Sequence, residues 1–127
     1  MEALVSWTGI SGNPYQFEVY AWGQEFNPVS GVYILCRLVG PGRYEALYVG
    51  EAKSLHDRLN TGLHDHDGAK RAIRERATHI AVLRTYDDTY RLGVETDLRH
   101  GLDPICNRQG VSETEAIRQI ARILSGA

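Results

Sequence analysis

The sequence predicts an α+β domain in which a small antiparallel sheet is flanked by helices and carries an extra β-hairpin at the N-terminus. Strand-like apolar runs separated by turn residues fill the first half of the chain. Helical spacing with capping residues dominates the second half. A length of 127 residues suits one domain. We expect residues 1–27 to form the hairpin extension, 28–108 the core and 109–127 a C-terminal helix.

Two hairpins are expected first along the chain. "ALVSWTG" and "YQFEVYAW" are rich in aromatic and β-branched residues, and the turn signal "ISGNP" separates them. "VYILCRLV" is a nearly continuous apolar run, "GPGR" is a turn, and "YEALYVG" is the partner strand. Gly31 marks the entry to this second hairpin and Gly50 its exit. The two glycines are expected to permit tight turning or close backbone approach.

Short helices are expected after the hairpins. Ser54 can cap a helix over residues 55–63 in which Leu55 and Leu59 share one face. Asp67 can cap a second, highly charged helix over residues 68–77 that should lie on the surface. "THIAVLRTY" then has the composition of a third strand in this part of the chain.

A longer helix is expected to begin at Asp87 or Asp88 and to end near Gly101, before Pro104. Ser112 and Glu115 form a capping box for the last helix. At helical spacings the inward stripe of the longer helix should be Leu92, Glu95, Leu98, Arg99 and Leu102.

The carboxylate in this stripe, Glu95, stands where leucine would be ordinary. A buried and unpaired carboxylate is unfavourable. Glu95 should therefore face a partner, a metal ion or a cleft. Pairing with Arg91 or Arg99 at helical spacing is the structural alternative.

Composition limits the possible functions. The formal net charge is −2, which argues against indiscriminate coating of nucleic acid. Residues 37–84 nevertheless carry nine Lys or Arg against six acids, which fits a phosphate-binding face and equally an ordinary solvated surface. No apolar run reaches the roughly 18 residues of a membrane-spanning helix, and no signal peptide is recognisable. Cys36 and Cys106 lack metal-type spacing and are expected to be free, buried thiols of a cytoplasmic protein.

Five polar residues are poorly explained by packing alone, and they occur in a particular order. "GVY" ends in Tyr33, and after fourteen further residues "YVG" begins with Tyr48. Arg58 lies ten residues beyond Tyr48, and Asn107 lies twelve residues beyond Glu95. This series, over residues 31 to about 107, resembles the GIY-YIG nuclease family, which includes a domain of the bacterial excision-repair nuclease, homing endonucleases and restriction enzymes. "YVGEAKSLHDRL" is particularly similar to the repair-nuclease motif.

The resemblance implies an endonuclease that hydrolyses DNA phosphodiester bonds with one divalent cation, Mg²⁺ or Mn²⁺. Glu95 would hold the cation, because carboxylate oxygens suit such hard ions. Arg58 would present its guanidinium fork to the phosphate. We assign the general base to Tyr48 and the orientation of water or phosphate to Tyr33, with the reverse as the alternative. Asn107 is expected to brace the site through its amide.

Other substrate-binding residues are less well specified. Where the repair-nuclease motif has lysine, this chain has Glu51, and Lys53 is either its substitute or simply solvated. "LHDHDG" offers His64 and His66, since some relatives use a histidine as an additional base. With the intervening aspartates, the same stretch could instead be a fortuitous metal-binding surface.

Two rival functions are compatible with the sequence. One is a non-catalytic module that keeps the fold to bind nucleic acid or a protein. The other is an interaction protein whose N-terminal aromatic residues form a dimer face or a platform for an unpaired base, although these side chains are expected to close the core. The favoured partner is DNA, cut in a structure-selective or partner-directed way, with monomer or homodimer left open. The aromatic residues are Trp7, Tyr15, Phe17, Tyr20 and Trp22.

Overall fold

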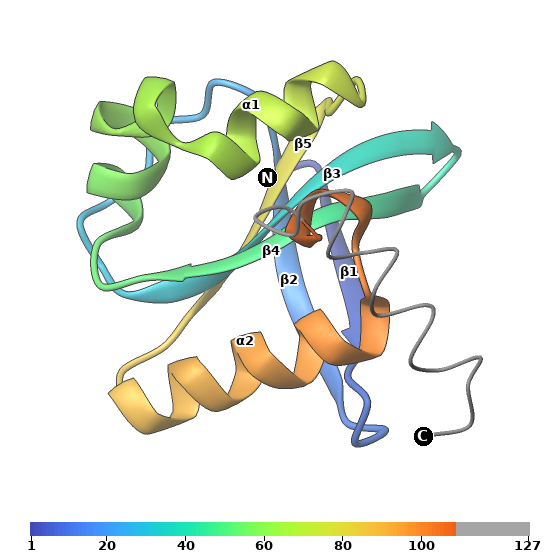
Figure 1. Cartoon of the computed structure of the whole chain (residues 1–127), viewed down its shortest axis with the longest axis vertical. Coiled ribbons are helices and arrows are strands. Elements are labelled where there is room, and N and C mark those ends of the chain that lie inside the picture. The colour runs from blue at the N-terminus through green and yellow to red at the C-terminus, as the bar shows by residue number, and fades with distance from the viewer. Residues whose placement is uncertain (109–127) are drawn as a thin grey trace, which may run out of the picture.

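The computed structural model describes residues 1–108 and confirms an α+β fold with one curled antiparallel sheet. Its five strands lie in the order β1-β2-β5-β3-β4 (Figure 1). The expected C-terminal helix with Ser112 and Glu115 falls outside the described residues. The strands are β1 (Ala3–Thr8), β2 (Pro14–Ala21), β3 (Gly31–Gly40), β4 (Arg43–Ala52) and β5 (His79–Arg84).

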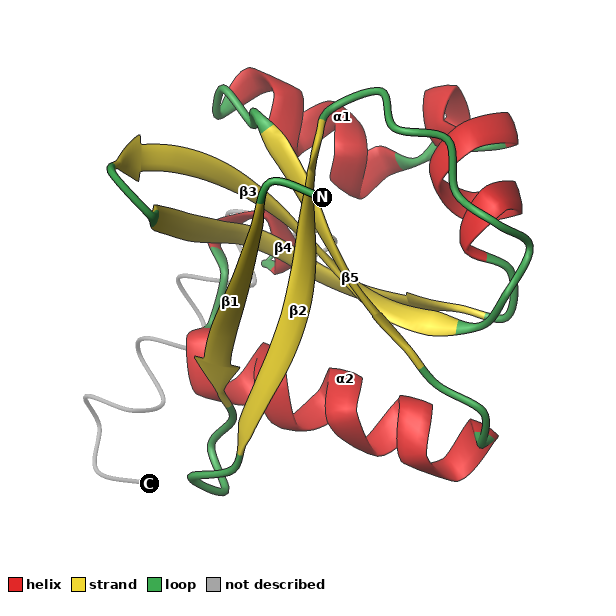
Figure 2. Ribbon diagram, turned by 180° about the vertical axis from the view of Figure 1, so that it is seen from behind, coloured by secondary structure: helices red, strands yellow, loops and turns green. Residues whose placement is uncertain are grey.

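Both predicted hairpins are present, β1 with β2 and β3 with β4. The N-terminal hairpin is more than an extension of the core, because β2 pairs with β5 from Glu18–Val82 to Ala21–His79. The hairpin therefore continues the same sheet (Figure 2). Pairing of strands so far apart in sequence leaves no local signal, which is why the sequence predicts the hairpin but not its place.

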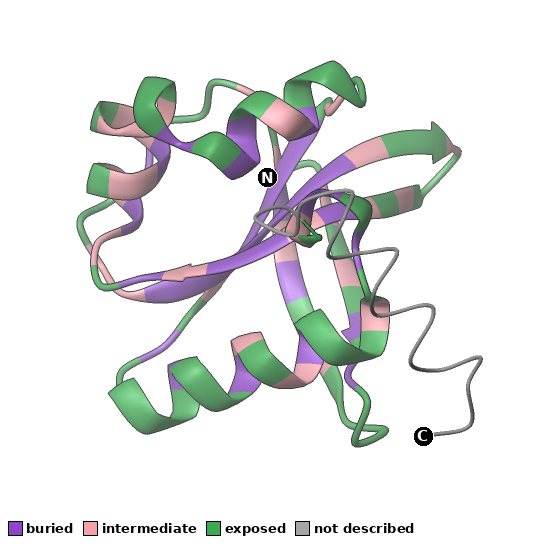
Figure 3. Cartoon of the chain, in the orientation of Figure 1, coloured by how far each residue is buried: buried purple, intermediate pink, exposed green. Residues whose placement is uncertain are grey.

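Two helices, α1 (Asp67–Arg74) and α2 (Asp88–Leu102), cover opposite sides of the sheet. Strand β3 lies between β5 and β4, and its alternate side chains enter the two cores. Tyr33 and Leu35 pack on the α1 side, whereas Ile34 packs on the α2 side. Burial on both faces explains the continuous apolar run of β3, and Figure 3 shows its first part buried.

The aromatic residues of the N-terminal hairpin close the core, as expected. Trp7 and Phe17 are buried and meet edge to face, with ring centroids 5.6 Å apart. Cys36 and Cys106 are buried and free. In residues 1–108, no helix is sufficiently long and apolar to span a membrane.

The predicted short helix over residues 55–63 is present, and Ser54 Oγ accepts the Asp57 N–H at 3.2 Å near its start. It consists of a π-helical turn, Asp57–Thr61, followed by a 3₁₀ turn, Leu63–Asp65. Its apolar face is confirmed, because Leu55 and Leu59 are buried. The wide turn needs Gly62, where a Cβ would lie 2.7 Å from the Asp57 carbonyl oxygen.

Helix α1 begins at a different cap from the one predicted. Nδ1 of His66, rather than the Asp67 carboxylate, accepts the backbone N–H of Ala69 at 3.1 Å. An unprotonated imidazole nitrogen satisfies the exposed N–H of a helix start as a carboxylate does. Asp67 instead lies in the first turn and faces Lys70 at 3.8 Å.

Helix α2 confirms Asp87 as its cap, because Asp87 accepts the Tyr90 N–H at 2.8 Å. The predicted inward stripe needs correction. Leu92 is 49% exposed, and the residues buried against the sheet are Arg91, Val94 and Leu98.

Candidate active site

A hollow of about 420 Å³ lies beside the edge strand β4, where the layers of α1 and α2 meet the sheet. Strand β4 contributes four consecutive positions, α1 contributes Arg71, and α2 contributes Glu95 and Arg99. The five residues singled out by their order in the sequence all line this one hollow. They are Tyr33, Tyr48, Arg58, Glu95 and Asn107.

Gly50 is the reason that Tyr33 can reach the hollow. The two residues are cross-strand partners on β4 and β3. A Cβ at Gly50 would overlap the phenol ring and hydroxyl of Tyr33. Gly31 has a comparable role at the strand entry, where a Cβ would lie 2.6 Å from the Leu83 carbonyl oxygen. Both expected close approaches are therefore present, and only glycine fits them.

Tyr48 stacks beside Tyr33, with ring centroids 6.1 Å apart and planes at 29°. Tyr48 is half-buried, whereas Tyr33 is only 1% exposed. Gly68 in α1 makes room for Tyr48, because a Cβ there would lie 2.6 Å from the ring. A glycine near a helix start is the sequence signal for this contact.

His66 joins the two tyrosines to the start of α1. Its Nε2 lies 2.5 Å from the Tyr33 hydroxyl, and its ring meets both phenol rings edge to face. Burial, together with Arg58 and Arg71, lowers the pKa of His66 to about 4. The imidazole is therefore neutral near pH 7. Because Nδ1 accepts from Ala69, the proton of neutral His66 lies on Nε2 and is donated to Tyr33.

The phenol of Tyr33 is held in its neutral form. Burial is the main cause of its raised pKa, and neighbouring Tyr48 adds to the effect. The guanidinium of Arg58 acts in the opposite direction. Since His66 donates to its oxygen, Tyr33 is free to direct its own O–H toward the hollow.

Glu95 enters the hollow from α2 and pairs with Arg99 one turn further on, Oε1 to Nε 3.1 Å. Burial raises the pKa of Glu95 more than Arg99 lowers it, and Glu51 raises it further. The expected partner at helical spacing is thus Arg99. Arg91, the other arginine considered, pairs instead with Glu51 at 2.6 Å and Asp88 at 2.7 Å.

Arg58 lies on the π-helical turn and lines the hollow opposite the α2 residues. Glu51, which lines the same hollow, is paired with Arg91. On the α1 side, Arg71 donates from Nε to the Cys106 carbonyl at 2.9 Å. The hollow therefore has three guanidiniums and two carboxylates in its wall.

Asn107 is bonded to the outer edge of β4. Its Oδ1 accepts the Val49 N–H at 2.7 Å, and its Nδ2 donates to the Val49 carbonyl at 2.8 Å. The amide thus completes the hydrogen bonding of one edge-strand residue, as a further strand would. These bonds agree with the expected bracing role.

Comparison with known proteins finds no matching family model, curated protein or solved structure. The chemistry of the hollow therefore has to be argued from its own side chains. In residues 1–108, no group of three or more His, Cys, Asp or Glu side chains is arranged to hold a metal ion. A cation at Glu95 would complete its coordination with water and ligand oxygens, which is the usual way in which Mg²⁺ binds.

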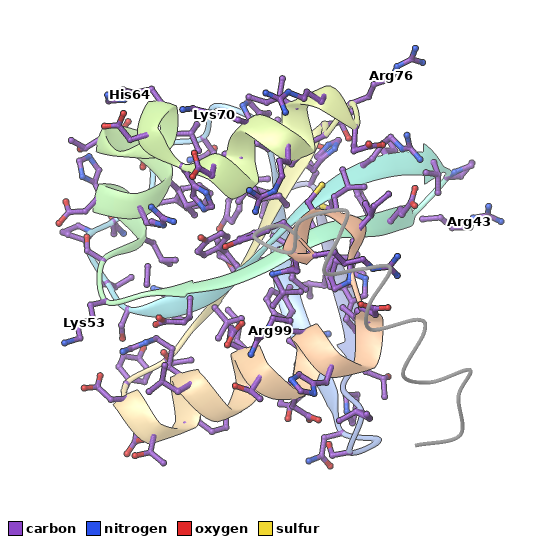
Figure 4. All side chains as sticks on the ribbon, in the orientation of Figure 1. Arg43, Lys53, His64, Lys70, Arg76 and Arg99 are labelled. Atoms are coloured by element: carbon purple, nitrogen blue, oxygen red, sulfur yellow. The ribbon has the colours of Figure 1, made fainter. Side chains whose placement is uncertain are left out.

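The structure places the three less well specified substrate-binding residues in different surroundings. His66 is 0% exposed and supports Tyr33 from beneath the hollow. His64 is exposed and faces Asp65 at 3.3 Å, away from the hollow (Figure 4). Lys53 also points outward and lines an adjoining hollow that shares Glu51 and Arg58 with the first. Arg71 and Arg99 were not predicted as site residues, because the sequence alone does not bring their helices together.

Proposed function

We propose that this chain is a divalent-cation-dependent endonuclease of the GIY-YIG type that hydrolyses DNA phosphodiester bonds. The observation that carries the proposal is the convergence of five residues from different elements on one hollow. Packing alone gives no reason for two phenols, a guanidinium, a carboxylate and an amide to meet there. The residues are Tyr33, Tyr48, Arg58, Glu95 and Asn107.

The charges in the hollow suit a phosphodiester. Arg58, Arg71 and Arg99 outnumber the two carboxylates, and one of those, Glu51, is already paired with Arg91. Guanidinium groups recognise phosphate through paired hydrogen bonds. Because β4 is an edge strand, a nucleic-acid backbone can approach it without displacing another strand.

The two tyrosines have different roles in this proposal. Tyr48 is the general base that accepts a proton from the attacking water. Tyr33 remains a phenol, in keeping with its burial and raised pKa, and orients the water or the phosphate. A free phenol, with a pKa of about 10, is phenolate about once in a thousand at pH 7, a deficit of about 4 kcal/mol, so a tyrosine base in general needs positive charge beside it.

Glu95 is the residue that would hold Mg²⁺ or Mn²⁺. A single available carboxylate fits one cation, because the second carboxylate is held by a buried arginine. When bound, the cation would supply positive charge to the phosphate oxygens and the departing alkoxide. Arg58 would hold the phosphate from the opposite wall, and Asn107 would keep β4 in place.

Nicking of supercoiled plasmid in the presence and absence of Mg²⁺ tests the proposal. We expect Mg²⁺-dependent nicking by the wild type and a loss of at least about 100-fold in Glu95→Gln and Tyr48→Phe, since each removes charge stabilisation or the base. Arg43→Gln is the matched control, because Arg43 lies on the far hairpin turn and points away from the hollow (Figure 4). Thermal unfolding establishes that the variants are folded.

The same experiment separates the rival function. Binding of DNA without nicking, in every metal tested, would replace the nuclease proposal by a non-catalytic nucleic-acid-binding module. Full activity of both Glu95→Gln and Tyr48→Phe would remove the assignment of the hollow as the active site. Including branched DNA and RNA identifies the preferred substrate.

A further inference from the structure

Glu95 and Arg99 form an ion pair whose two members differ in access to solvent. The carboxylate side chain is 15% exposed, whereas the guanidinium side chain is 44% exposed. Both line the hollow, and Figure 4 shows Arg99 on the side of α2 that faces β4. A partly buried acid is thus held by a partner that can move into solvent without disturbing the core.

The neighbouring ion pair joins Glu51, in the same hollow, to Arg91, which lines the adjoining hollow, and it is of a different kind. Arg91 is 4% exposed and bonds Glu51 at 2.6 Å and Asp88 at 2.7 Å. Separating Glu51 from Arg91 would take one of its two carboxylate partners from a buried guanidinium, which is unfavourable. Glu51 therefore has a fixed partner, while the partner of Glu95 is exchangeable.

The largely buried Glu95 carboxylate lies 3.1 Å from the Arg99 guanidinium. A divalent cation bound to Glu95 would be attracted by the carboxylate, but it would lie beside the positively charged Arg99 guanidinium. Like charges at this distance repel, so Arg99 has to move if a cation is to bind well.

A phosphodiester bound in the hollow would give the Arg99 guanidinium an alternative anionic partner. Arg99 already lines the hollow together with Arg58 and Arg71, and its planar fork matches phosphate oxygens. Transfer of Arg99 from carboxylate to phosphate exchanges one ion pair for another. It also leaves Glu95 free for the cation.

We propose that Arg99 couples cation binding at Glu95 to the entry of nucleic acid. In the free protein Arg99 shields the carboxylate; with a phosphodiester in the hollow it turns to the phosphate. This inference rests on the proposed function. It requires the free protein to bind divalent cations weakly, and it requires DNA and cation to strengthen each other's binding by the same factor.

The first test measures Mn²⁺ binding to the protein alone by electron paramagnetic resonance. Arg99→Gln keeps the helix and removes the competing charge, so it should bind Mn²⁺ roughly 5-fold or more tightly than the wild type. Arg43→Gln, which removes an equal charge far from the hollow, should match the wild type. Glu95→Gln should lose the binding.

The second test measures the affinity for a short fluorescent DNA duplex by anisotropy, with and without Ca²⁺. The wild type should bind DNA more tightly with the cation, and Arg99→Gln should lose most of this gain. Equal Mn²⁺ affinity of Arg99→Gln and wild type, or an unchanged Ca²⁺ effect on DNA binding, would overturn the coupling. If Glu95→Gln binds Mn²⁺ like the wild type, the cation site of the proposed function fails as well.

Discussion

The Tyr33 hydroxyl lies 2.5 Å from Nε2 of His66, and this contact fixes the hydrogen-bonding direction of both groups. Because the other imidazole nitrogen accepts from Ala69 at the start of α1, the His66 proton can only point at Tyr33. A residue that caps a helix thereby controls how a strand residue presents its hydroxyl. The first prediction tests this arrangement.

His66→Asn should reduce the proposed DNA cleavage roughly 10- to 100-fold, as expected when a group in the active site loses its alignment. Asparagine is a good helix cap and retains an oxygen for the Ala69 N–H, but it is too short to reach Tyr33. Plasmid nicking rates of His66→Asn, Tyr33→Phe and the double variant provide the measurement. Since the two side chains act as a unit, the double variant should be little worse than either single one.

His64→Asn is the matched control, because His64 is 77% exposed and lies only two residues away in the sequence. It should cleave at the wild-type rate. Multiplicative losses in the double variant would mean that His66 and Tyr33 contribute independently, contrary to this account.

A second prediction concerns acid stability. The pKa of His66 falls from 6.5 to about 4 on folding. The unfolded chain therefore binds more protons between these values, and the free energy of unfolding decreases as the pH falls through this window. The depression corresponds to about 3 kcal/mol, lost between pH 6.5 and pH 4.

Urea unfolding of wild type and His66→Asn at pH 7 and pH 4.5 isolates this contribution. Carboxylates such as Asp97, whose pKa is lowered mainly by its hydrogen bond from Ser11, also lose stabilising interactions in acid. They do so in both proteins, so the difference between the two pH dependences belongs to His66. Identical losses in the two proteins would contradict the prediction.

A third prediction follows from two glycines that differ in what surrounds them. Gly50→Ala places a methyl group against the buried Tyr33 phenol and should lower the free energy of unfolding by about 1–3 kcal/mol. Gly93→Ala, in α2, has nothing within 4 Å and should raise it by about 0.5–1 kcal/mol. Urea denaturation measures both. Equal effects would show that backbone entropy, not the contact with Tyr33, decides the result.

The sequence predicts well those features that depend on neighbours along the chain. Turn residues between apolar runs indicate both hairpins, and the cap at Asp87 follows from a polar residue before a helical pattern. The pairing of β2 with β5 does not follow, because it joins segments about sixty residues apart (Glu18 with Val82). Loop closure over such a distance is decided by burial of the whole sheet.

The residues of the candidate site also fall into those that can be predicted from the sequence and those that cannot. The five residues selected through the family resemblance all line the hollow. The sequence could not reveal that His66 is buried beneath Tyr33 or that Arg99 faces β4. The positions of these two side chains depend on where α1 and α2 pack against the sheet. The predicted inward stripe of α2 includes Leu92 because leucine is usually buried, but Leu92 is exposed. Arg91 is buried instead, because it pairs with the carboxylates of Glu51 and Asp88.

A fourth prediction concerns the amide that completes β4. Asn107→Ala removes both hydrogen bonds to the Val49 backbone and should cost about 1–3 kcal/mol of unfolding free energy. Asn107→Asp keeps an acceptor for the Val49 N–H but sets a carboxylate against the Val49 carbonyl, so it should be destabilised as well. Amide hydrogen exchange distinguishes them, since the Val49 N–H should exchange faster in the alanine variant than in the aspartate variant. Val49 protection that survives Asn107→Ala would mean that β4 is held by its pairing with β3 alone, and that Asn107 braces nothing.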